Sequence, residues 1–192
     1  MQGIGFWGPC RTRKSRMFEG LYCRVNRPVS PALLDQARRN VQQALEHSYT
    51  RGVKTLVISD ENMLGTSKHN LQTATLYPEA ERRLSRFAAA FEGSVDRVML
   101  GMRSLEQYWP STIAFAVKRG ASLPEQSKLD DISESARSWR DVAQDVADSF
   151  FSAGVELHSY EHFASRPDLR LAQAVGAPVL TASIPQKRLN VA

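Results

Sequence analysis

The stretch that decides the fold of this chain runs from Val98 to Ser111 and reads VMLGMRSLEQYWPS. Its apolar start is typical of a buried strand, and the residues from Leu105 onward keep the spacing of a helix. Arg103 and Ser104 therefore lie where a strand meets a helix N-terminus, and unpaired backbone N–H groups favour an anion at such a point. The Arg-x7-Ser spacing of Arg103 and Ser111 occurs three more times in the chain. Only this copy starts at a strand–helix junction, so its location, and not its spacing alone, indicates an anion-binding site.

Working outward from this stretch, strand patterns alternate with helix patterns along the chain. The expected strands are Ile4–Pro9 (a short strand or an extended lead-in), Thr55–Ile58, Val95–Met102 and Val155–Tyr160. The expected helices are Pro31 to Gly52, Glu79–Phe91, Leu105–Lys118, Trp139–Phe151 and Pro167–Gly176. The polar segment Ala121–Glu134 is expected to be an excursion or a mobile loop. This alternation predicts an α/β fold in one domain over residues 1–192, with a parallel sheet covered by helices on both faces.

Polar side chains follow three of the expected strands at their carboxyl ends, namely Asp60–Glu61, Arg103–Ser104 and Tyr160–Glu161. Ligands of parallel sheets bind beyond the carboxyl ends of the strands. We therefore expect these three groups to lie close together and to form the functional site.

Each of these side chains has a functional and a structural interpretation. Arg103 is expected to make a charge-assisted contact with a phosphate, whereas the structural alternative pairs it with Glu106. Glu61 is a candidate general base for a hydroxyl acceptor, and Asp60 either shares that role or caps the following turn. Glu161 is expected to brace the strand–helix junction by accepting hydrogen bonds.

Composition and charge exclude several function classes. The chain has 192 residues, 42% of them hydrophobic, and no apolar stretch long enough to span a membrane. Its two cysteines, Cys10 and Cys23, lack metal-ligand spacing. We expect two free thiols in a reducing cytoplasm, and the alternative is a disulfide between them. No metal site is expected.

The net charge of +5 includes a basic cluster at residues 11–27 that suits nucleic acid or an anionic small ligand. Because aromatic residues do not alternate with the cluster, nucleic acid is the least favoured partner.

These segments, in this order, resemble the sulfotransferase family of the P-loop nucleotide-binding fold, and in particular its divergent bacterial members. In that family, a strand leads into an Arg-x7-Ser segment that binds the 3′-phosphate of 3′-phosphoadenosine 5′-phosphosulfate. Arg103 and Ser111 match this segment, and Ser104 lies between them. A later strand, Tyr160-Glu161, Pro167 and a helix ending at Gly176 resemble the family's C-terminal signature.

The resemblance implies a three-layer sheet and the transfer of a sulfuryl group from this nucleotide to a hydroxyl on a small molecule or a carbohydrate. Arg103, Ser104 and Ser111 would bind the nucleotide, and Glu61 or Asp60 occupies the slot of the catalytic base. The chain departs from the family at its start, because Gly3-Ile4-Gly5 resembles the segment after the family's first helix.

The first strand and the Gly-x-x-Lys-Thr-type loop that binds the phosphosulfate are therefore expected to be missing. Sulfuryl transfer depends on such a preorganised loop, so enzyme activity is left open. The alternative is a catalytically inactive remnant that binds an anion, a nucleotide or a partner protein.

Overall fold

The computed structural model describes residues 3–22, 28–163 and 166–176. They form two compact units that each draw on separate parts of the sequence. Unit 1 takes its residues from 1–65, 79–98 and 145–154, and unit 2 takes its residues from 66–78, 99–144 and 155–192. The expectation of a single domain stays a prediction, and Cys23, one of the two expected free thiols, lies outside the described residues.

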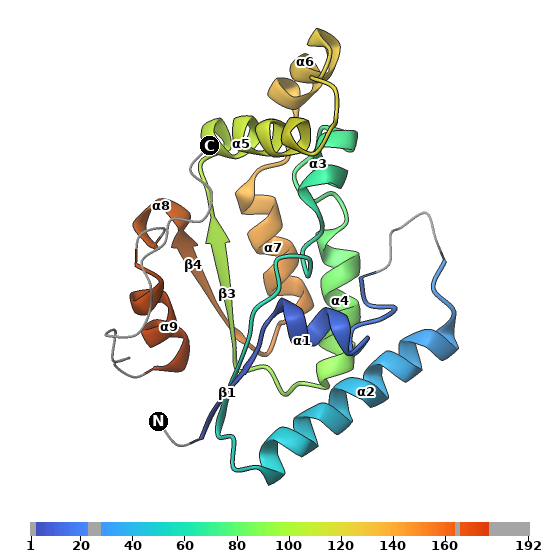
Figure 1. The fold of residues 1–192 in the computed structure, drawn as a ribbon, viewed down its shortest axis with the longest axis vertical. Coiled ribbons are helices and arrows are strands. Elements are labelled where there is room, and N and C mark those ends of the chain that lie inside the picture. Colours follow the sequence, from blue (N-terminus) through green and yellow to red (C-terminus); the bar gives the residue numbers. More distant parts are fainter. Residues whose placement is uncertain (1–2, 23–27, 164–165, 177–192) are drawn as a thin grey trace. The chain divides into compact units, whose positions relative to one another are not determined.

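Unit 1 is built on a pair of parallel strands. Strand β1 (Ile4–Trp7) pairs with β2 (Thr55–Ile58), with Ile4 beside Thr55 and Trp7 beside Ile58. Its helices are α1 (Pro9–Lys14), α2 (Pro31–Thr50) and α4 (Ala80–Phe91). Helix α2 packs against α4, and Figure 1 shows the two helices crossing. The expected start of α2 is confirmed, because the Ser30 hydroxyl accepts the Leu33 N–H at 3.3 Å and Pro31 is the first helical residue.

The core of unit 1 is aromatic. Phe18, Phe87 and Phe91 are almost completely buried, and the Phe18 ring meets the Phe87 ring edge-on at a centroid distance of 5.1 Å. Arg83 of α4 is also buried, and its guanidinium donates to the backbone carbonyls of Tyr22, Asn62 and Met63. This arginine holds the loop after β2 against the core and so positions the residues that follow β2.

Unit 2 contains the carboxyl ends of a second parallel pair, β3 (Arg97–Met102) and β4 (Gly154–Ser159). Its helices are α3 (Ser67–Thr73), α5 (Leu105–Lys118), α6 (Gln126–Glu134), the start of α7 (Trp139–Ser149), α8 (Tyr160–Phe163) and α9 (Pro167–Val175). Helix α3 packs on α5. The aromatic rings of Tyr77, Tyr108, Trp109 and Trp139 gather in this unit.

The expected α/β class and the parallel pairing of strands are confirmed. Within the described residues the strands form two separate two-stranded sheets, and the finer three-layer, P-loop-type arrangement remains a proposal. The expectation of a loop over Ala121–Glu134 is wrong in its second half, which forms α6. The short helices α1 and α3 were not expected either. No helix in the described ranges combines the length and apolarity that crossing a bilayer requires.

Candidate functional site

The strand–helix junction in unit 2 places Arg103 and Ser104 as the sequence predicts. Strand β3 ends at Met102, and Ser104 is the residue that caps the N-terminus of α5. The Ser104 side chain makes no capping hydrogen bond, so backbone N–H groups in the first turn of α5 are left for another acceptor. The junction thus keeps its expected preference for a negative charge.

A carboxylate of the same unit already supplies a negative charge at this junction. Glu161, on α8, accepts the Ser104 backbone N–H at 3.2 Å and the Ser159 hydroxyl at 2.7 Å. These hydrogen bonds, led by the one from Ser159, and the charge of Arg103 hold the pKa of Glu161 below its ordinary value. Glu161 is therefore ionised at neutral pH and braces the junction, as expected from the sequence.

Arg103 is anchored on two sides but keeps one donor without an acceptor. Its carbonyl accepts the Trp139 indole N–H at 2.6 Å, and its guanidinium carbon lies 5.2 Å from the centre of the Tyr160 ring. Its Nε is buried and has no hydrogen-bond partner within the described residues. A buried donor without an acceptor is unfavourable by about 1–3 kcal/mol.

Ser111 lies farther along α5 than the junction. It is half-buried and follows Ser104 by seven residues, which corresponds to about 10 Å along a helix axis. Arg103 stacks on Tyr160 at the N-terminal end of α5. The joint grip of Arg103 and Ser111 on one phosphate therefore stays a prediction.

Asp60 is a fully engaged carboxylate in unit 1. Its oxygens accept hydrogen bonds from Thr12 (2.5 Å), Arg13 (2.8 Å), Tyr22 (2.5 Å) and the Asn62 backbone N–H (3.0 Å). Burial acts to raise the pKa of Asp60, but these four hydrogen bonds outweigh it and the pKa lies below the ordinary value. A carboxylate held in this way is a poor proton acceptor, so its geometry is that of a structural hub.

Glu61 is the more accessible of the two candidate bases. Its side chain is 70% exposed, and it pairs with Arg13, whose guanidinium lies 2.7 Å from Oε1 and also pairs with Asp60. Asp60 and Glu61 belong to unit 1, whereas Arg103, Ser104 and Ser111 belong to unit 2. The structure brings Asp60 and Glu61 together around Arg13. It brings Arg103 and Ser104 together with Tyr160 and Glu161 at the junction, and the convergence of these two sets, like the grip of Ser111, remains a prediction.

Sequence reasoning missed the partners of Asp60 and the approach of one cation to Gly101, two residues before Arg103. Thr12 and Arg13 lie 48 and 47 residues from Asp60, so only the pairing of β1 with β2 could reveal them. The missed cation is Arg170 of α9, whose Nη2 lies 3.2 Å from where a Cβ of Gly101 would be. The available signal was Gly101 itself, a residue without a side chain inside a strand.

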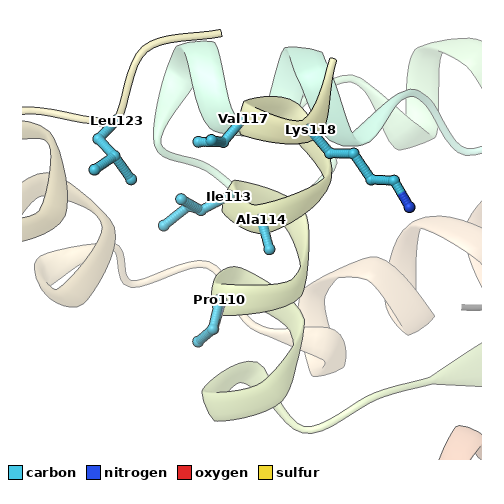
Figure 2. Close-up of a pocket in the computed structure, with 6 residues that line it drawn as sticks. All are labelled: Pro110, Ile113, Ala114, Val117, Lys118 and Leu123. Carbon is cyan, nitrogen blue, oxygen red and sulfur yellow. The ribbon is translucent and has the colours of Figure 1, made fainter. Parts of the chain in front are cut away.

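An apolar groove lies along α5 in unit 2, as Figure 2 shows. Pro110, Ile113, Val117 and Leu123 line it, with Lys118 at its side, and its volume is about 580 Å³. Polar groups do not converge in it, so it lacks the usual signature of a catalytic pocket. Over the described ranges, His, Cys, Asp and Glu side chains form no group that could hold a metal ion.

Comparison of the chain with protein-family models, with curated proteins and with solved structures finds no match.

Proposed function

We propose that this chain binds the phosphate group of a nucleotide at the junction of β3 and α5. The observation that supports this function is the buried Nε of Arg103, which lacks an acceptor beside a helix N-terminus. A guanidinium offers donors in a planar fork that matches phosphate oxygens. Ser104, the residue after Arg103, is exposed at the same junction, so its hydroxyl is accessible to the ligand.

The nucleotide implied by the resemblance is 3′-phosphoadenosine 5′-phosphosulfate or its product, adenosine 3′,5′-bisphosphate. The residues at the junction fit the 3′-phosphate, because Arg103 supplies both a positive charge and an unsatisfied donor. Tyr160, whose ring lies next to this arginine, is 42% exposed as a residue, so its ring gives the site a flat apolar wall.

The test is a calorimetric titration with adenosine 3′,5′-bisphosphate. Arg103→Ala is expected to weaken binding by about 10- to 100-fold, because a charge-assisted hydrogen bond contributes about 1.5–3 kcal/mol. The matched control is Arg119→Ala, which removes the same charge from the opposite end of α5, where Arg119 stacks on Phe115. Equal affinity in the wild type and Arg103→Ala would contradict the assignment.

A second candidate function is sulfuryl transfer from this nucleotide to a hydroxyl acceptor, and the exposure of Glu61 favours it. Glu61 offers an accessible carboxylate directly after β2, whereas the oxygens of Asp60 are already engaged. As a general base, Glu61 would take the proton of the acceptor hydroxyl as it attacks sulfur.

This function predicts that Glu61→Gln lowers the rate of transfer by about 10²- to 10⁴-fold with nucleotide affinity unchanged. The measurement is the release of adenosine 3′,5′-bisphosphate in the presence of a set of carbohydrate and small-molecule acceptors. Nucleotide binding without any release by the wild type would instead support the non-catalytic alternative.

A further inference from the structure

Helix α5 carries an apolar row on a side of the helix separate from its buried face. Trp109 and Thr112 are buried in unit 2, whereas Pro110, Ala114 and Val117 are exposed. Residues three and four apart lie on the same side of a helix, so these three exposed residues form a continuous row. The exposed side of a helix in a soluble protein normally carries polar residues, so this row indicates a face that packs against a further element.

The row forms one wall of the groove along α5, and Leu123 forms the other. Leu123 follows the end of α5 and is 73% exposed. Figure 2 shows its side chain on the same side of α5 as those of Ile113 and Val117. The groove is open along the helix and apolar apart from Lys118 at its side, so its shape suits a second helix better than a compact polar ligand.

Opposite charges flank the apolar row at its two ends. Glu106 lies four residues before Pro110, and Lys118 lies four residues after Ala114. Both charged residues are exposed, and neither has an ion pair in the part of the chain that the structure describes. A copy of the same row that runs in the opposite direction would bring unlike charges together at both ends, whereas a parallel copy would bring like charges together. The charges of the row are therefore complementary to those of an antiparallel copy.

We propose that a second copy of this chain covers this row, with α5 of one copy antiparallel to α5 of the other about a two-fold axis. In such an interface, if residue i faces residue j, then residue j faces residue i. With the axis at the level of Thr112, Glu106 of each copy faces the partner's Lys118. Pro110 of each copy then faces the partner's Ala114, whose small side chain lets the two helix axes approach to about 8–10 Å. This inference goes beyond the proposed phosphate-binding function and does not depend on it.

The length of the row sets the expected strength of the dimer. The row spans about two turns of α5, so we expect it to bury less surface than the about 1,200–2,000 Å² of a standard interface. The dimer should therefore dissociate on dilution. The test is sedimentation velocity on the full chain between about 1 and 200 μM, where the wild type should shift from a species of 21.5 kDa toward twice that mass.

The pairing of the two charges is tested by exchanging them. Glu106→Lys and Lys118→Glu are each expected to weaken the dimer by about 10-fold, because each change turns two attractive pairs into repulsive ones. The double variant Glu106→Lys/Lys118→Glu exchanges the charges and should restore the affinity of the wild type within about 3-fold. Both positions are exposed, so we expect each variant to fold, and thermal unfolding checks this.

The matched control is Arg119→Glu, which reverses the charge of a side chain that stacks on Phe115, outside the row. It should leave the affinity of the dimer within about 3-fold of the wild type. Ala114→Arg places a long charged side chain at the centre of the row and should keep the chain monomeric throughout the concentration range. The charge exchange decides alone if Ala114→Arg does not fold.

Three outcomes would overturn the proposal. A wild type that stays monomeric at about 200 μM excludes the second copy as the partner of this face. A dimer that Ala114→Arg leaves intact places the interface on another surface. Two weakened single variants without recovery in the double variant exclude the antiparallel arrangement.

Discussion

At the scale of single residues, Asp60 is the most constrained carboxylate of unit 1, and its removal has a defined effect. Asp60→Asn loses the charge that binds Arg13, Thr12 and Tyr22. We expect the free energy of unfolding to fall by about 2–4 kcal/mol, a value reduced by the partial exposure of Arg13. Urea unfolding measures this loss, and the control Glu61→Gln should stay within about 0.5 kcal/mol because its carboxylate is exposed.

The free energy of unfolding of the wild type and of Asp60→Asn, measured as a function of pH, checks that the loss is electrostatic. The pKa of Asp60 is lower in the folded chain than in the unfolded one, so the unfolded chain binds more protons at low pH. Ionised Asp60 therefore contributes its full stabilisation above about pH 5. This stabilisation is lost as the pH falls below about 4 toward the pKa that Asp60 has in the folded chain. The stability gap between wild type and Asp60→Asn should narrow over that range, and a gap of constant size would contradict an electrostatic origin.

At the scale of elements, the sequence signal was strong where an element was long or capped. Helix α2 has a serine cap, a proline at its first position and a glycine after its end, and its apolar period runs from Leu33 to Leu45, about three turns. Strand β2 is a run of β-branched and aliphatic residues. Helices α1, α3 and α6 have six to nine residues, which is too short for an apolar period to stand out from chance.

The residues of the candidate site also divide into those that a local sequence pattern predicts and those that it does not. Arg103, Ser104 and Glu161 could be placed at a strand–helix junction because a local pattern of strand, arginine and helix predicts it. The contacts between Thr12, Arg13 and Asp60 depend on which strands pair, and the approach of Arg170 to Gly101 depends on how α9 lies on β3 and β4. Neither follows from local sequence, since both join residues more than 45 positions apart.

At the scale of the whole molecule, the net charge of +5 includes a basic cluster whose arginines, in the part that the structure describes, are paired with carboxylates or stacked on a ring. In unit 1, Arg13 pairs with Asp60 and Glu61, and Arg16 pairs with Glu19 at 3.1 Å. Arg11 lies over the Trp7 ring, 5.0 Å from its centre. Several positive charges of the cluster are thus compensated by carboxylates or an aromatic ring of the same unit. Binding to a polyanion requires charges that are available to displace counterions.

This compensation predicts that DNA binds weakly and independently of Arg103. In fluorescence anisotropy with a single strand of about 20 nucleotides, we expect a Kd weaker than about 10⁻⁴ M at about 150 mM salt. Arg103→Ala should leave that value unchanged while it weakens adenosine 3′,5′-bisphosphate binding in the same buffer. A compact ligand that contacts Arg103 releases few counterions, so its affinity should fall only several-fold between about 50 and 200 mM salt. Micromolar DNA binding with a steep salt slope would instead mean that the basic residues act together as a nucleic-acid surface.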